Sequence, residues 1–362
     1  MDLQSDVCIV GAGPGGALLA VLLAEAGLSV VVLERHASVF KEFRGELVNE
    51  DGERILNKHH VLKEVERLGM LLLERIEYME NGKLIRTVVP GEGHIHVGIH
   101  MPQKHLLQVL FDRLEASPNA KLLTGVTVTQ LLKDDHGTVK GVSGRHGSQT
   151  ITVNSRITVG ADGRYSTVRK LAGIPTDMLS HGYDLLWARI PSPEGWEPII
   201  RMTLAQDAQL ALFTQQGGYI QIGWSIPEGK YAEMKKQPID GLIDALVAAY
   251  PDLETTARAN LQSWSDFVLL KVHSSRADSW VRDGFVIMGD AAHTMSPTGA
   301  FGLNCALNDA DTLAIVLSEA LAEQNTSAAR LAEFERTNRQ PTEALQDKQF
   351  EMERTFSGQF GL

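Results

Sequence analysis

The sequence has little cysteine and no excess of basic residues. Its two cysteines, Cys8 and Cys305, are too few for a disulfide framework or a cysteine-based metal site. The 34 Lys and Arg residues stand against 45 Asp and Glu, which gives a formal net charge of -11. This acidic balance argues against nucleic acid or an anionic membrane surface as the main partner. We therefore expect a small-molecule partner and a cytoplasmic, reducing environment.

Long apolar runs and sequence repeats are also absent. No stretch approaches the ~18 consecutive apolar residues of a membrane-spanning helix. Residues 1–6 contain no basic segment of the kind that begins a signal peptide. Aromatic residues are also scarce, at 6% of the chain. Any cluster of them in one predicted sheet is therefore a candidate ligand pocket. We expect no transmembrane segment.

Two kinds of β-strand pattern divide the 362 residues. Short β-branched apolar runs bounded by Gly or Asp predict buried strands of a parallel sheet at 7–10, 29–33, 157–159 and 285–288. Alternating segments between Pro and Gly turns predict an antiparallel sheet at 185–189, 209–213 and 219–224.

Helical patterns follow these strands. They lie at 16–26, 104–116, 239–250, 306–322 and 328–353, and we expect Pro341 to interrupt the last one. The fold class is therefore α/β, with a Rossmann-like parallel-sheet domain, an interleaved antiparallel-sheet domain and a C-terminal helix. Because the chain leaves the first domain and returns to it, no cut near the middle would yield a folded piece.

A glycine-rich turn links the first predicted strand to the first helix. Gly11 allows the tight turn, Gly13 lets backbone N–H groups approach a pyrophosphate, and Gly16 lets the helix pack closely on the sheet. Glu34, at the end of the second strand, can accept hydrogen bonds from a ribose. This arrangement predicts a site for the adenosine diphosphate part of FAD or NAD.

Two later motifs point to one of these cofactors. Residues 160–169, Gly-Ala-Asp-Gly-Arg-Tyr-Ser-Thr-Val-Arg, form a DG-type motif, and residues 289–293, Gly-Asp-Ala-Ala-His, form a GD-type motif. With the N-terminal turn they resemble the three motifs of the class A FAD-dependent monooxygenases, single-component aromatic hydroxylases with the para-hydroxybenzoate hydroxylase fold. The resemblance implies FAD as cofactor. Because only one dinucleotide fingerprint is present, NAD(P)H is expected to bind transiently as electron donor.

The resemblance also suggests which residues contact FAD. Asp290 follows a buried strand, where its carboxylate can accept hydrogen bonds from the ribityl hydroxyls. Backbone N–H groups of residues 297–304 and the helix after them can face the isoalloxazine ring. Asp162 has the alternative role of holding its own turn. The further expected cofactor contacts are Arg35, Arg44, Gln103, Asp162, Arg169, Gly289, Gly299, Gly302, Leu303 and Asn304.

The implied reaction transfers a hydride from NAD(P)H to FAD and captures O2 as a flavin C4a-hydroperoxide. One oxygen atom then passes to an aromatic or quinone- or quinolone-like small molecule. Pro297 and Thr298, in the segment expected to cover the flavin, and His293 are the candidate catalytic residues. His273 and Arg189 are further candidates for a base or partner of a phenolic hydroxyl. An apolar wall is expected to hold the substrate, with candidates Leu185, Trp187, Leu210, Leu212, Phe213 and Trp224, and Arg189 is a further expected substrate contact.

Other functions remain open at this point. Residues 223–227, Gly-Trp-Ser-Ile-Pro, resemble half of the WxWxIP motif of flavin-dependent halogenases, but Ile222 replaces the first tryptophan. The same segment resembles a sheet motif of geranylgeranyl reductases. A non-catalytic FAD-binding module is a third alternative. No carboxylate or cysteine completes a metal site with His94, His96, His100 and His105, so no metal is expected.

The expected domain limits follow from these patterns. The FAD-binding domain takes residues 1–72, 101–175 and 276–325. The substrate-binding domain takes 73–100 and 176–275, and a helical segment covers 326–362. Since the sequence ends soon after its last predicted helix, we expect no extra C-terminal domain through which the protein would dimerise. We expect a monomer or a weak dimer.

Overall fold

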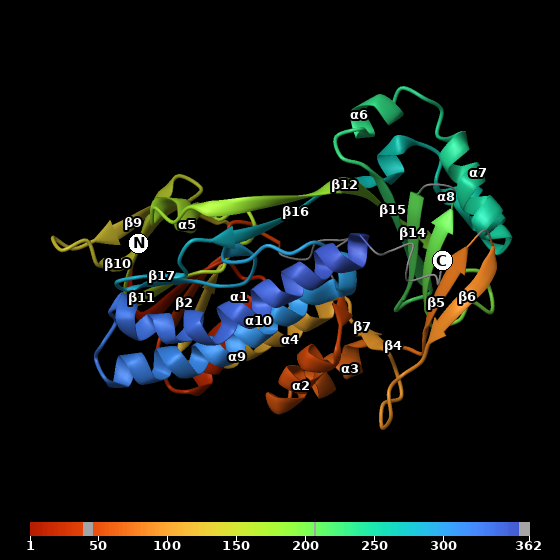
Figure 1. Cartoon of the computed structure of the whole chain (residues 1–362). Helices are drawn as coiled ribbons and strands as arrows, with labels where there is room; N and C mark the ends of the chain where they lie inside the picture. Colours follow the sequence, from red (N-terminus) through yellow and green to blue (C-terminus); the bar gives the residue numbers. More distant parts are fainter. Residues whose placement is uncertain (39–45, 81, 206–207, 355–362) are drawn as a thin grey trace. The chain divides into compact units, whose positions relative to one another are not determined.

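The computed structural model describes residues 1–38, 46–80, 82–205 and 208–354, so Arg44 lies outside the described residues. The chain divides into two compact units (Figure 1). Unit 1 comprises Met1–Leu68, Gln103–Leu179 and Ser274–Asp347. Unit 2 comprises Gly69–Pro102, Ser180–His273 and the chain from Lys348 on. Each unit thus draws on three segments that are far apart in the sequence.

A largely parallel sheet forms the centre of unit 1, with strand order β17-β18-β11-β1-β2-β8 and with β10 and β9 continuing from β11. The strand pairs β18–β11, β11–β1, β1–β2 and β2–β8 are parallel. Every residue of β2 is buried, as an apolar run between covered faces requires. The strands are β1 Asp2–Val10, β2 Val30–Leu33, β8 Ala120–Leu123, β9 Val126–Lys133, β10 Val139–His146, β11 Gln149–Gly160, β17 Val281–Arg282 and β18 Phe285–Ile287.

Helices accompany this sheet, and Figure 1 shows α9 and α10 running side by side. Residues 15–24 of α1 are all buried, so this helix is apolar on every side. The helix expected at 306–322 begins earlier, at Phe301. The helices are α1 Pro14–Glu25, α2 Glu50–Lys58, α3 Leu62–Leu68, α4 Gln103–Ala116, α5 Thr167–Leu171, α9 Phe301–Ala322 and α10 Ala328–Arg354.

The expected interruption at Pro341 is wrong, because α10 continues through this residue. Proline removes one backbone donor from a helix. Side chains on both sides of it anchor the helix to the rest of unit 1. Asn338 donates to Asp309 Oδ1 at 2.9 Å, and Gln346 Nε2 donates to the carbonyl oxygens of Ser275 and Thr294 at 3.1 and 2.8 Å. These tertiary contacts offset the lost helical hydrogen bond.

Unit 2 is built on the antiparallel sheet that the alternating segments predict. Its strand order is β16-β12-β15-β14-β13-β5-β6. The β12–β15, β15–β14, β14–β13 and β5–β6 pairs are antiparallel, and the β13–β5 pair is parallel. The strands are β5 Ile76–Glu80, β6 Lys83–Val88, β12 Thr176–Pro191, β13 Ile200–Ala205, β14 Ala208–Gln215, β15 Tyr219–Pro227 and β16 Val268–Ala277. Short strands β4 Leu71–Leu73 and β7 Gly98–His100 of unit 2 form a further antiparallel pair, and β3 Leu47–Val48 is a short strand of unit 1.

Helices α6 Tyr231–Met234, α7 Asp240–Ala249 and α8 Glu254–Asn260 belong to unit 2. Ile243 and Leu246 of α7 pack with Leu186, Ile222 and other inward side chains of the sheet in one buried cluster. One face of the sheet is therefore the core of unit 2. No helix in the described part of the chain is long and apolar enough to span a membrane.

Candidate active site

The three sequence motifs meet at one edge of the unit 1 sheet. Val10 pairs with Gly160, and Gly160 pairs with Ile287, so β1, β11 and β18 end together. Ala161 N donates to the Val10 carbonyl at 2.8 Å, and Met288 N donates to the Gly160 carbonyl at 3.0 Å. The carboxyl ends of parallel strands are where α/β sheets bind ligands. The segments that begin at Gly160 and at Met288 therefore lie beside the N-terminal turn.

The glycines of the N-terminal turn are required by close contacts. Gly11 has φ +109°, and a Cβ there would lie 2.3 Å from the carbonyl oxygen of Ala161. A Cβ on Gly16 would lie 2.2 Å from the carbonyl oxygen of Gly11. Gly13 differs, because a Cβ there would meet nothing within 4 Å. Helix α1 begins beside this open space, and no side chain caps its N-terminus. Uncapped N–H groups beside open space suit a phosphate.

Glu34 lies at the end of β2 and is buried, with 8% of its surface exposed. Its carboxylate accepts hydrogen bonds from Ala12 N at 3.0 Å and His36 N at 2.9 Å. Each carboxylate oxygen has further lone pairs, so it can also accept from a ribose hydroxyl. Arg35 is exposed, and its Nε donates to His36 Nε2 at 2.9 Å.

Asp162 holds the turn after β11, which is the simpler of its two expected roles. It accepts hydrogen bonds from Ser166 Oγ, Thr167 N and Val168 N at the start of α5. Burial raises the pKa of Asp162, and these hydrogen bonds oppose the shift. Arg169, four per cent exposed, donates from Nη1 to the Ala291 carbonyl at 2.7 Å. Arg169 of the DG-type motif thus stabilises the backbone of the GD-type motif through this hydrogen bond.

A buried polar network fixes residues 289–293. Asp309 Oδ2 accepts hydrogen bonds from Gly289 N at 2.8 Å and from His293 Nε2 at 2.7 Å. Burial is the largest single effect and lowers the pKa of His293, but the charge and hydrogen bond of Asp309 together with the charge of Asp290 raise that pKa, so the net shift is upward. His293 is only 2% exposed, which leaves it little access to a substrate. In contrast, the Asp290 side chain is 36% exposed, with Arg164 Nε 3.9 Å away.

The loop before α9 forms a second open helix N-terminus. Gly299 and Ala300 have φ +72° and +54°, and no side chain caps α9. Pro297 and Thr298 precede this turn, and Gly302 and Leu303 lie half-buried in the first turn of α9. A Cβ on Gly15 would lie 2.9 Å from the Ala306 carbonyl, so α1 and α9 pack closely. Two helices whose N-termini carry no side-chain cap therefore pack against each other in unit 1, and both N-termini can attract negative charge.

Asn304 and Gln103 connect this site to the chain after residue 45. Asn304 Nδ2 donates to the carbonyls of Ala300 at 2.8 Å and Leu47 at 3.2 Å, and its Oδ1 accepts from Asn49 N at 3.1 Å. Gln103 begins α4, and its backbone N donates to Glu46 Oε1 at 3.0 Å. Asn304 thus shapes the loop through three hydrogen bonds.

These features fit FAD. The open space at Gly13, the acid at Glu34, the partly exposed Asp290 carboxylate and the N-terminus of α9 all belong to unit 1. An elongated dinucleotide needs donors for its phosphates and its flavin ring, and acceptors for its ribose and ribityl hydroxyls. The site provides both kinds of group.

The candidate substrate residues of unit 2 do not form a single wall. Leu210, Leu212 and Trp224 point into the helix-packed core with Leu186. Successive residues of a strand face opposite sides, so Trp187, Arg189 and Phe213 lie on the other face. The ring centroids of Trp187 and Phe213 are 6.1 Å apart, and the Arg189 guanidinium lies 4.7 Å from the centroid of the Tyr219 ring.

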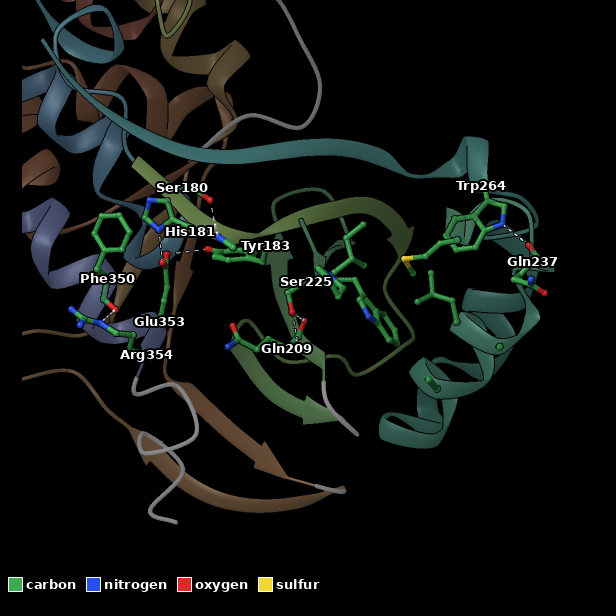
Figure 2. Close-up of a pocket in the computed structure, with 18 of the residues that line it drawn as sticks. Ser180, His181, Tyr183, Gln209, Ser225, Gln237, Trp264, Phe350, Glu353 and Arg354 are labelled. Atoms are coloured by element: carbon green, nitrogen blue, oxygen red, sulfur yellow. Dashed lines mark hydrogen bonds and ion pairs between the residues drawn. The ribbon is translucent and has the colours of Figure 1, made fainter. Parts of the chain in front are cut away.

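Unit 2 also contains an open hollow of about 820 Å³ (Figure 2). On one side of it, His181 and Tyr183 of β12 both contact the Glu353 carboxylate near the end of α10. The His181 ring stacks on Phe350 with a centroid distance of 4.1 Å. Trp264 and Gln237 lie on the opposite side in Figure 2. This arrangement fastens the last turns of α10 to β12.

Among the described residues, no group of three or more His, Cys, Asp or Glu side chains has the arrangement of a metal site. His100, one of the four neighbouring histidines named in the sequence analysis, is buried and accepts a hydrogen bond from Gln216 N at 3.0 Å. His273 lies half-buried on β16.

Comparison with known proteins identifies the family. The model of a family described as an FAD binding domain matches residues 4–348. The 6-methylpretetramide 4-monooxygenase of Streptomyces rimosus is 35% identical, over 93% of this chain and 82% of the relative. This chain belongs to the class A FAD-dependent monooxygenases. The protoasukamycin 4-monooxygenase of Streptomyces nodosus subsp. asukaensis is 26% identical over 97% of this chain and 88% of the relative.

Solved structures confirm the class A monooxygenase fold. PqsL of Pseudomonas aeruginosa, solved with 2-aminobenzoylacetate, has a TM-score of 0.85 at 22% identity and covers 97% of this chain and 96% of its own. The p-nitrophenol 4-monooxygenase PnpA of Pseudomonas putida has a TM-score of 0.80 at 20% identity, over 98% and 89% of the two chains. These structures confirm the predicted α/β fold. The family model and the 35% identical relative confirm the FAD cofactor and the enzymatic function.

The sequence interpretation missed Asp309, Asn338 and Asn49, which support the monooxygenase motifs from other elements. The sequence itself contains one signal that points to Asp309. Asp309 lies between Leu307 and Ala310 on the mostly apolar buried side of α9. A carboxylate on a buried stripe needs hydrogen-bond donors, and in the structure these are Gly289, His293 and Asn338.

Proposed function

We propose that this monooxygenase hydroxylates an aromatic or quinone-like ring of a small biosynthetic molecule. The overall reaction consumes the substrate, O2, NAD(P)H and a proton, and yields the hydroxylated product, NAD(P)+ and water. When bound, FAD supplies the redox chemistry. The observation that carries the proposal is the joined arrangement of Gly13, Glu34, Asp290 and the α9 N-terminus, which fits this cofactor.

Each part of the proposed FAD site has a distinct role. Gly11 and Gly16 let the turn close, and N–H groups near Gly13 bind the pyrophosphate. Glu34 accepts from the ribose and Asp290 from the ribityl hydroxyls. The N-terminal N–H groups of α9 face the flavin edge that becomes negative on reduction. Arg35, Gln103, Gly299, Gly302 and Leu303 lie in the segments that line this site.

Other predicted residues act through the protein. Asp162 holds the turn of the DG-type motif. Arg169 connects that motif to Ala291 of the GD-type motif. Asp309, through His293, fixes the turn that presents Asp290, so the role of His293 in this proposal is to hold that turn. Pro297 and Thr298 cover the flavin. NAD(P)H binds transiently, and the enzyme is a monomer or a weak dimer.

The substrate-facing surface in this proposal is the sheet face of unit 2 that carries Trp187, Arg189 and Phe213. These three side chains remain partly accessible, whereas the cluster on the opposite face is buried under helices. The 35% identical relative is named for oxidation of 6-methylpretetramide, which supports a substrate of a similar biosynthetic kind. We expect an apolar or aromatic substrate.

Removal of the Asp290 carboxylate tests the cofactor site. We expect Asp290→Ala to lose most of its bound FAD while remaining folded, because the ribityl hydroxyls lose their acceptor. The ratio of flavin to protein absorbance measures occupancy, and circular dichroism measures folding. Asp112→Ala, on the exposed side of α4, is a matched control that should retain FAD. Unchanged occupancy in Asp290→Ala would refute the ribityl role.

Isotope labelling tests the reaction class. One atom of ¹⁸O2 should appear in the product, and substrate should accelerate NAD(P)H oxidation. A second candidate function has a specific basis, since a digeranylgeranylglycerophospholipid reductase of Methanococcoides burtonii is 25% identical over 93% of this chain. Saturation of a prenyl double bond without oxygen would favour that alternative. Incorporation of chloride would indicate a halogenase.

A further inference from the structure

Trp187 and Gly223 make an unusually close cross-strand pair in the unit 2 sheet. They are directly opposite each other on β12 and β15. A Cβ on Gly223 would lie 2.6 Å from Cζ3 and 2.9 Å from Cη2 of the Trp187 indole. Both distances are shorter than real Cβ contacts allow, so the six-membered part of the indole covers the glycine. Only glycine at position 223 permits this position of the ring.

The residues around this pair leave the indole on a low, flat surface. Ala211 is opposite Gly223 on β14, so two of the smallest residues lie in register beside one tryptophan. Phe213 stands two residues further along the same face, its ring tilted by 53° to that of Trp187. We call Trp187, Ala211, Phe213 and Gly223 the aromatic platform. Trp187, Ala211 and Phe213 are all only half-buried.

A buried amide pair lies next to the aromatic platform. Gln221 is paired with Phe213 across β14 and with Arg189 across β12, so it shares their face. Gln215 Nε2 donates to Gln221 Oε1 at 2.5 Å, and both residues are buried, with 5% and 7% exposed. This bond uses one lone pair of Gln221 Oε1. The Gln221 side chain also carries an NH2 group, which can donate a hydrogen bond to a ligand.

We propose that the aromatic platform selects planar fused-ring phenols or quinones over single-ring phenols, and that the Gln221 amide donates to a ring oxygen of the ligand. The inference rests on the proposed function and names its substrate class. A fused ring system covers more of the flat indole than one ring does, so it gains more from stacking and from burial of apolar surface. The amide gives the ligand a fixed orientation.

A single added methyl group tests the aromatic platform. Gly223→Ala forces the Trp187 ring to move, while the chain keeps every functional group. The probes are 1,2-dihydroxyanthraquinone, with three fused rings, and 4-nitrophenol, with one. We expect the FAD-loaded variant to bind the fused-ring probe about tenfold more weakly than the original enzyme does, and 4-nitrophenol less than about twofold more weakly. Equal losses for both probes, or no loss, would overturn the proposal.

Tryptophan fluorescence provides a second readout that a general loss of stability would not produce. Stacking on Trp187 should quench its emission when 1,2-dihydroxyanthraquinone binds. This quenching should largely disappear in Trp187→Phe and persist in Trp264→Phe, whose indole lies on the helix-packed side of the sheet. Quenching that is the same in both variants contradicts the proposal. Flavin content and the midpoint of thermal unfolding show that each variant is folded and loaded.

The amide is tested separately. Gln221→Leu keeps the size of the side chain and removes the donor, so we expect about a tenfold loss of affinity for 1,2-dihydroxyanthraquinone. Affinity for anthraquinone-2-sulfonate, which lacks the hydroxyls, serves as a comparison and should also fall if Gln221 binds a ring carbonyl. A variant that binds both compounds as tightly as the original enzyme contradicts the role of Gln221.

The failure of this inference is distinguishable from failure of the proposed function. If ¹⁸O enters a product and Gly223→Ala has the same kcat/KM as the original enzyme for fused-ring and single-ring substrates, the monooxygenase stands and the aromatic platform is wrong. If fused-ring probes bind through Trp187 but no ¹⁸O enters any product, the aromatic platform stands and the proposed reaction is wrong.

Discussion

Units 1 and 2 offer ligand-binding groups of different kinds. In unit 1 the groups that fit FAD are mainly backbone N–H groups at helix N-termini, which glycines leave accessible. In unit 2 the proposed groups are side chains from three neighbouring strands, such as Trp187, Phe213 and Gln221. A backbone site is sensitive to any added Cβ, whereas a side-chain site is sensitive to which face of the sheet a residue occupies. The four predictions that follow test this difference.

The largest effect is expected where an added Cβ meets backbone. Gly11→Ala should lower the free energy of unfolding by about 4 kcal/mol and abolish FAD binding, because φ +109° is strained for alanine and its Cβ would lie 2.3 Å from Ala161 O. Gly27→Ala is the matched control, since Gly27 has φ +86° and open space around it. Its loss should be about 1 kcal/mol. Denaturant titration measures the free energy of unfolding of both variants. Equal losses in the two would show that the close contact with Ala161 does not cause the loss of stability in Gly11→Ala.

Adjacent residues of β12 should respond differently in unit 2. Leu186→Ala creates a cavity under α7 and should cost about 3 kcal/mol of stability, with little change in affinity for aromatic ligands. Trp187→Ala should cost less stability, since its ring is half-buried, but should lose most of that affinity. Denaturant titration and ligand titration on both variants check this. A reversed result would place the binding face on the helix side of the sheet.

A smaller effect is expected for the buried acid that supports the third motif. Asp309→Asn replaces an acceptor that has three donors and adds an NH2 group with no acceptor, so we expect a loss of about 2 kcal/mol and weaker FAD binding. Asp311→Asn, two residues later on the same helix, breaks contacts with Lys58 and His59 that are more exposed. It should cost less than about 1 kcal/mol. If the midpoint of thermal unfolding falls equally in Asp309→Asn and Asp311→Asn, the buried hydrogen bonds of Asp309 do not stabilise the protein more than the exposed contacts of Asp311 do.

The smallest effect is a pH dependence. The pKa of His293 is raised in the folded protein, because the Asp309 and Asp290 carboxylates and the hydrogen bonds to the imidazole together outweigh the effect of burial. Its protonated form therefore adds stability that is fully present below the ordinary pKa of histidine and is lost as the pH rises through the raised value. The stability advantage of the original protein over His293→Gln should shrink between pH 6 and pH 9. An advantage that grows with pH would reverse the assigned sign.

The motifs of unit 1 could be predicted because each is local. Gly11, Gly13, Gly16 and Glu34 lie within 24 residues, and the turn chemistry requires glycine at set spacings. Asp309 was missed because its partners lie about 20 and 29 residues away and its role depends on how α9 packs. Pro341 misled the prediction because local propensity favours a break, whereas tertiary contacts with Asn338 and Gln346 hold α10 together.

By itself, the sequence determined the class of fold, the FAD fingerprint and the order of the three motifs, because these depend on spacing along the chain and on the geometry of single turns. Only the tertiary structure decided which aromatic residues share a surface. Leu212 and Phe213 are neighbours in the sequence and face opposite sides of the sheet, whereas Trp187 and Gly223 are 36 positions apart and in contact. Strand register sets such contacts, and it is fixed only when the strands pair.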